Sequence, residues 1–125
     1  MKKLIYTLTI LVAFFAIQSC KKDQVFNKPK TVVIDTTIRS GTDLRLDLKQ
    51  YGDADDVATI TQQPATFAVS EIVSPSNPFA PVYHYSATTK TTFKDKAVIT
   101  IKEGSTGRRG NELEATITIN LTVNP

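Results

Sequence analysis

The sequence of 125 residues contains one cysteine, one histidine and no tryptophan. A single cysteine cannot form an intrachain disulfide. The single histidine, His84, and the absence of a second thiol exclude the usual Ser-His and Cys-His nucleophile systems, as well as zinc sites of ordinary composition. Glycine-rich phosphate loops and the H-E-x-x-H and G-x-S-x-G patterns are also missing. The sequence therefore predicts a protein that is not an enzyme and needs no cofactor.

Positive charge is concentrated at the front of the chain. Residues 1–30 hold six lysines and one acid, whereas residues 31–125 hold nine Lys and Arg and eleven Asp and Glu. The formal net charge of +3 is thus a property of the first 30 residues. A nucleic-acid-binding domain carries its basic surface on the folded part. We therefore expect no nucleic-acid partner.

The first 19 residues have the pattern of an export signal. Lys2 and Lys3 precede a mostly apolar stretch at residues 4–17. A helix that crosses a bilayer needs about 20 apolar residues, so this stretch is short for an anchor and suits the central region of a signal peptide. The alternatives are a secretory signal followed by an incidental cysteine and an anchor that is not cleaved.

The cysteine that follows resembles the lipidation site of bacterial lipoproteins. Ile17-Gln18-Ser19-Cys20 resembles a lipobox, with serine at position −1 and isoleucine at −3. The resemblance implies that residues 1–19 are removed and that acyl chains are attached to Cys20. Two or three chains would anchor the protein firmly, because each buried methylene contributes about 0.8 kcal/mol. Lys21 in place of an aspartate implies, for these families, transfer to the outer membrane.

The SCKKD junction is similar to that of Bacteroidetes-type lipoproteins, many of which reach the cell surface. This resemblance covers residues 1–24 and implies a protein of the cell envelope, held at the outer membrane by the lipid on Cys20. The resemblance leaves open whether the protein lies on the periplasmic face or on the cell-surface face of the outer membrane. Residues 20–30 are polar, contain Pro29 and show no period, which is typical of a flexible tether.

From residue 31 onward, apolar and polar residues alternate, which is the period of half-buried strands. The alternation is clearest in residues 113–123, where Leu, Ala, Ile and Val alternate with Glu, Thr and Asn. We expect strands at residues 31–38, 43–49, 57–62, 66–72, 82–88, 97–102 and 113–123. Seven short strands with one polar face each predict an all-β, antiparallel Ig-like β-sandwich over residues 31–125.

One part of this region resembles known modules. The stretch YHYSATTKTTFKDKAVITI is similar to the end of bacterial Ig-like and cadherin-like domains, in which a tyrosine-containing strand is followed by a phenylalanine and a closing strand. Because successive strands of such a sandwich run in opposite directions, the loops 51–56, 73–82 and 103–112 should lie at the end where the first strand begins. The C-terminus should lie at the opposite end.

These three loops hold the candidate contact residues. Asp53, Asp55 and Asp56 form a weak calcium candidate because calcium prefers oxygen-rich loops, although Asp and Gly are also ordinary turn residues, and we expect no metal site. Phe79 lies among three prolines and either packs on the core or is exposed for recognition. Arg108 and Arg109 are either solvated or contact anionic headgroups or acidic glycans. His84 should face outward, because its neighbours Tyr83 and Tyr85 belong to the inward set.

Three functions remain open from the sequence. The first is a non-catalytic Ig-like lipoprotein that binds a protein partner and serves adhesion or envelope assembly. The second is a glycan-binding accessory lipoprotein of a polysaccharide-uptake system, although the chain has no tryptophan to form the aromatic platform that sugars favour. The third is an enzyme or an enzyme inhibitor. In the first two, Phe79, Arg108 and Arg109 are the expected contacts for the partner or the membrane.

Overall fold

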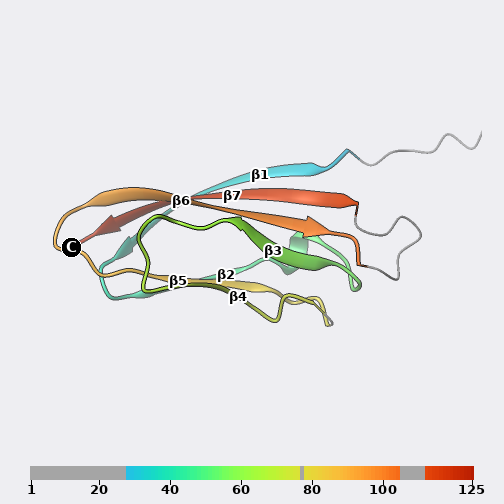
Figure 1. The fold of residues 1–125 in the computed structure, drawn as a ribbon, viewed down its shortest axis with the longest axis horizontal. Helices are drawn as coiled ribbons and strands as arrows, with labels where there is room; N and C mark the ends of the chain where they lie inside the picture. Colours follow the sequence, from blue (N-terminus) through green and yellow to red (C-terminus); the bar gives the residue numbers. More distant parts are fainter. Residues whose placement is uncertain (1–27, 77, 105–111) are drawn as a thin grey trace, which may run out of the picture.

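The computed structural model describes residues 28–76, 78–104 and 112–125. They form two β-sheets that lie one above the other (Figure 1). One sheet has four strands in the order β1-β7-β6-β3, and the other has three strands in the order β2-β5-β4. The strands are β1 (Lys30–Arg39), β2 (Asp43–Asp47), β3 (Val57–Gln62), β4 (Val69–Val73), β5 (Val82–Ser86), β6 (Phe93–Lys102) and β7 (Leu113–Asn124). The prediction of an all-β sandwich of seven strands is confirmed.

Strand boundaries differ from the expected ones where local hydrogen bonds intervene. The second strand ends early, because Pro81 accepts the N–H of Leu48 but has no N–H to return a ladder bond, and the chain then turns into a short 3-10 helix, η1 (Lys49–Tyr51). The fourth strand begins late, because the backbone N–H groups of Ala65 and Thr66 both donate to the carboxylate of Asp95. β6 begins earlier than expected, at Phe93, where it already pairs with Val123 of β7.

One strand pair is parallel, whereas the other pairs within the two sheets are antiparallel. β1 runs beside β7 from Lys30 opposite Ala115 to Arg39 opposite Asn124. Successive strands alternate in direction, so the first and the seventh run the same way and must pair in parallel when they are neighbours. The expectation of a purely antiparallel arrangement is corrected for this pair alone.

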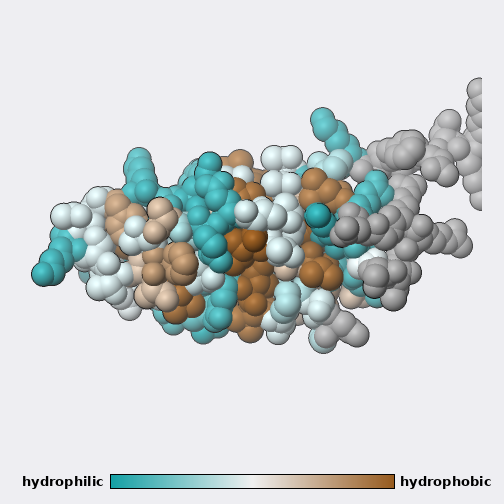
Figure 2. All heavy atoms as spheres, in the orientation of Figure 1, coloured by the Kyte–Doolittle hydropathy of each residue, from teal (hydrophilic) through white to brown (hydrophobic). Residues whose placement is uncertain are grey.

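The core lies between the two sheets. The inward side chains of β7, from Ala115 to Val123, are buried, as are Tyr83 and Tyr85 of β5. A second group is only partly buried, and most of its members belong to the edge strands, where the space between the sheets opens: Val32, Ile34, Ile38, Leu44, Leu46, Ile60 and Ile72. Figure 2 shows apolar side chains reaching the surface in a band across the middle of the sandwich.

The predicted grouping of the loops is confirmed for the described residues. Leu48, after β2, donates its backbone N–H to Pro81, before β5, within the three-stranded sheet, and Gly104 lies against the backbone carbonyl of Asp55. The ammonium of Lys30, at the start of β1, lies 5.4 Å from the ring centroid of Tyr51 in η1. The C-terminus lies at the opposite end of the sandwich (Figure 1). Arg108, the expected third member of this loop group, lies outside the described residues.

Candidate functional site

The acidic turn at the end of the sandwich where β1 begins is organised by Asp56. This residue is 4% exposed, and its Oδ2 accepts a 2.6 Å hydrogen bond from the backbone N–H of Asp53. The backbone N–H of Asp56 in turn donates to the carbonyl of Asp53. In the described part of the chain, no three His, Cys, Asp or Glu side chains are placed so that they could hold a metal ion. Asp53 to Asp56 thus form a turn closed by the carboxylate of Asp56, and the weak calcium candidate at Asp53, Asp55 and Asp56 has no converging set of ligands within the described residues.

Phe79 belongs to the core. It is 5% exposed, and its ring lies so close to Gly52 that a Cβ on that glycine would come within 2.6 Å of the ring. The close approach joins the loop after β2 to the loop before β5. The expectation that Phe79 contacts a partner or the membrane is therefore corrected, and the alternative of packing on the core holds.

The end of the sandwich where β1 begins gathers several carboxylates in its described part. Burial raises the pKa of Glu114, and the nearby carboxylates of Asp56 and Glu103 raise it further. Lys28 and Lys30 lie on the same side and line a hollow of about 250 Å³ together with Asp53 and Glu114. Arg108, Arg109 and Cys20 lie outside the described residues, so their proposed contacts and the lipidation remain predictions.

His84 points away from the core, as expected, but it is not freely solvated. Its side chain is 12% exposed and stands at the centre of the three-stranded sheet. Nδ1 lies 3.3 Å from Glu71 of β4, and Nε2 lies 3.3 Å from Asp43 of β2. Because the two carboxylates approach opposite ring nitrogens, the cluster links three strands and does not converge on one point, as a metal site or a general base with its substrate would require.

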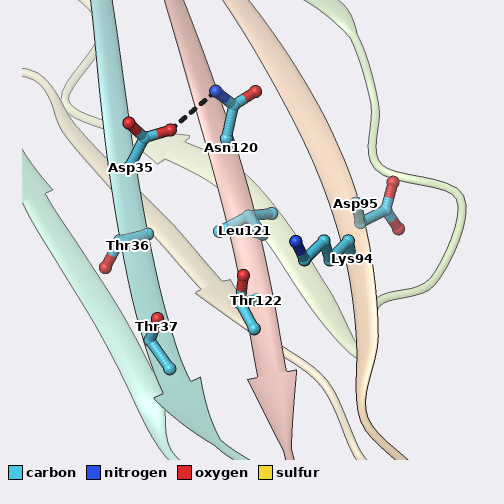
Figure 3. A pocket seen from close by; sticks show the side chains of 8 residues that line it. All are labelled: Asp35, Thr36, Thr37, Lys94, Asp95, Asn120, Leu121 and Thr122. Carbon is cyan, nitrogen blue, oxygen red and sulfur yellow. Dashed lines mark hydrogen bonds between the residues drawn. The ribbon is translucent and has the colours of Figure 1, made fainter.

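A polar hollow lies on the outer face of the four-stranded sheet. Figure 3 shows Asp35 and Thr37 of β1 facing Asn120 and Thr122 of β7, with Lys94 of β6 beyond them. The hollow measures about 480 Å³. Asn120 donates a 2.7 Å hydrogen bond from Nδ2 to Asp35 Oδ1, which holds both side chains in place. Carboxylate, amide, hydroxyl and ammonium groups here can bind a polar ligand by hydrogen bonds.

This hollow was not predicted from the sequence. The alternation did place these side chains on the polar faces of their strands. Asp35 and Asn120 are 85 positions apart, however, and they become neighbours only through the register of the parallel pair. A pattern within one strand fixes the face of each side chain, but it does not show which strand lies beside it.

Comparisons with known proteins add little to this picture. No protein-family model matches the chain, and no curated protein matches it. Among solved structures, the chain is similar to the cysteine protease inhibitor EhICP2 from Entamoeba histolytica, with 12% sequence identity and a TM-score of 0.43, over 78% of this chain and 100% of that one. A separate feature of the structure is that none of its described helices is long and apolar enough to span a membrane.

Proposed function

We propose that the chain is an outer-membrane lipoprotein whose Ig-like β-sandwich binds a protein partner without catalysis, in adhesion or envelope assembly. The observation that carries the proposal is the sequence Ile17-Gln18-Ser19-Cys20 directly after an apolar stretch of export-signal length. The sandwich begins at Lys30. Residues 20–29 would therefore tether the domain at a reach of about 33 Å when stretched, at about 3.3 Å per residue.

Incorporation of labelled palmitate in cells tests the anchor. The wild-type chain should take up label, and Cys20→Ser should not, because it removes the only sulfur to which a diacylglycerol could attach. Ser19→Ala is the matched control, since it keeps a small residue before the cysteine and should retain the label. Label in Cys20→Ser, or none in the wild type, would contradict the proposal.

The glycan-binding alternative is favoured by the polar hollow at Asp35 and Asn120. Its lining offers both donors and acceptors for sugar hydroxyls, although none of its lining residues is aromatic. A glycan array probed with the full chain tests this alternative. Binding that is lost in Asn120→Ala and kept in Asn124→Ala, an amide on the same strand outside the hollow, would support it. No binding, or equal binding by both variants, would contradict it.

A further inference from the structure

The sandwich has four edge strands, and β1 differs from the other three. β3 is interrupted by a bulge between Ile60 and Gln62. β2 and β4 are five residues long. β1 pairs with β7 through ten residues without a bulge, and it contains no proline and no lysine after its first residue. Natural sheets shorten, bulge or charge their edges to prevent pairing with other chains. β1 is neither short nor bulged, and its charges are confined to Lys30, Asp35 and Arg39, so it is the least protected of the four edges.

The exposed side of β1 also carries apolar surface. Val33 is 61% exposed on the outer face. Val32, Ile34 and Ile38 point toward the core and remain only partly buried, because no described strand lies beyond β1 in the sheet. A further strand along this edge would cover the side chains that lie opposite it, and it would pair the backbone groups of β1 that face away from β7.

We propose that this edge pairs antiparallel with β1 of a second copy of the chain. Such pairing would join the two four-stranded sheets into one sheet across a two-fold axis. The proposal does not rest on lipidation, because it uses only residues of the folded domain.

The charges on β1 favour the register of this pairing in which opposite charges face each other. The apolar face of each sheet stays continuous only if residues directly opposite one another point to the same side. An axis at Asp35 would set two carboxylates opposite each other, which is destabilising. An axis at Thr37 pairs residues 35–39 of the two strands and sets Asp35 opposite Arg39 of the second copy, and the symmetry repeats this ion pair. Thr37 then faces itself, which is a favourable cross-strand pair.

The side chain of Asp35 is held in place and has a carboxylate oxygen available for the ion pair with Arg39 of the second copy. Its Oδ1 accepts the hydrogen bond from Asn120, and its other carboxylate oxygen makes no hydrogen bond within the described residues (Figure 3). Arg39 is exposed at the end of β1. In this register the two Lys30 ends leave the pair in opposite directions, about 46 Å apart at about 3.3 Å per residue. The pair can therefore form between copies anchored on two membranes that face each other, or between copies whose domains lie flat on one membrane.

Disulfide trapping tests the proposal on the full chain in detergent, with Cys20→Ser to remove the native thiol. In the proposed pair, the two Cα atoms of residue 37 lie about 4.5–5.5 Å apart, within the range of about 4.4–6.8 Å that a disulfide requires. Thr37→Cys should therefore form a covalent dimer under mild oxidation. Thr122→Cys, its neighbour on β7 in the same row, should stay monomeric, because about three strand spacings of 4.8 Å separate it from its copy.

A charge swap on the Thr37→Cys background tests the register. It also excludes cross-linking that arises only because two chains share one detergent micelle. Asp35→Arg should lower the cross-linked fraction several-fold, and adding Arg39→Asp should restore it, because the ion pair re-forms with its signs exchanged. Unchanged thermal unfolding of each variant would confirm that it is folded. No dimer with Thr37→Cys, equal dimer with Thr122→Cys, or no restoration by the double swap would overturn the proposal. In cells, cross-linking of Thr37→Cys only to a different protein would also overturn it.

Discussion

At the scale of single residues, alternate positions of β7 face opposite environments. Ile119 has no exposed surface and lies opposite Ala97 on one side and Ile34 on the other. Thr118, one position earlier, points to the outer face and is only partly buried. The inward set predicted for residues 113–123 is therefore confirmed, since alternation within one strand depends only on that strand.

Ile119→Ala should lower the free energy of unfolding by about 2–5 kcal/mol, because it leaves a cavity that the neighbouring strands fill only in part. Thr118→Ala is the matched control and should cost less than about 1 kcal/mol. Chemical denaturation of both variants measures the difference. Equal losses would mean that the two faces of β7 had been exchanged.

Tyr85 links β5 to the loop before β4. Its hydroxyl donates a 2.9 Å hydrogen bond to the carbonyl of Thr66. Burial, and then the carboxylate of Asp95, raise the pKa of Tyr85 from 10.0 to about 12. In the unfolded chain the phenol loses its proton at a lower pH than in the folded protein. Deprotonation above pH 10 therefore stabilises the unfolded state and lowers the free energy of unfolding. The stability due to this proton is complete below pH 10 and is lost as the pH rises toward 12.

We therefore expect the free energy of unfolding to fall between pH 10 and about 12. Tyr85→Phe should be less stable at pH 8, because the hydrogen bond to Thr66 is lost, and it should show a shallower fall at high pH. Part of the fall should remain, since burial also raises the pKa of Tyr83. Denaturation curves at several pH values measure both effects. An equally steep fall in Tyr85→Phe would show that this phenol does not carry the dependence.

Some single residues could not have been assigned from the sequence. Asp95 was an ordinary strand residue in the pattern, yet it holds backbone groups about 30 positions earlier in the chain. His84 was correctly placed on the outer face, but its two carboxylate neighbours come from β2 and β4. Both roles depend on which strands lie side by side, and alternation carries no information about that.

At the scale of elements, the loops at the end where β1 begins are held together by the close approach of Gly52 to Phe79. A Cβ on Gly52 would lie 2.6 Å from Cζ of Phe79 and 2.7 Å from Oδ2 of Asp56. Glycine is therefore needed here for space, and the buried ring of Phe79 fills the site that a side chain would occupy.

Gly52→Ala should cost about 1–3 kcal/mol through overpacking. Phe79→Leu should also destabilise the protein, but Gly52→Ala should cost less in the Phe79→Leu background than in the wild type, since the smaller side chain leaves room. A thermodynamic cycle of the four proteins, measured by denaturant unfolding, gives the coupling. Strictly additive losses would contradict the close approach.

The strands themselves were largely predictable, and their ends were not. β3 has the bounds expected from the sequence, because polar and turn residues flank a clear alternation. β4 begins late because Asp95 binds the backbone N–H groups of Ala65 and Thr66, and β2 ends early because Pro81, opposite Leu48, has no N–H to return a ladder bond. Such tertiary hydrogen bonds decide where a strand begins or ends, and no local pattern reports them.

At the scale of the whole molecule, the alternating directions of the strands place the start of β1 and the C-terminus at opposite ends (Figure 1). The orientation was predictable because it follows from strand count and alternation alone. The parallel pairing of β1 with β7 was not, since it requires knowing that the first and last strands are neighbours. If the proposed lipid anchor holds the chain at Cys20, the acidic described end of the domain faces the membrane and the C-terminus faces away.

The mass of the intact chain extracted from cell envelopes tests the central proposal most directly. A lipoprotein anchored at Cys20 should have the mass of residues 20–125 plus a diacylglyceryl group, with or without a further acyl chain on the new N-terminus. The added mass should map to the peptide that begins at Cys20. The mass of the complete chain of 125 residues, or of a processed chain without lipid, would contradict the account.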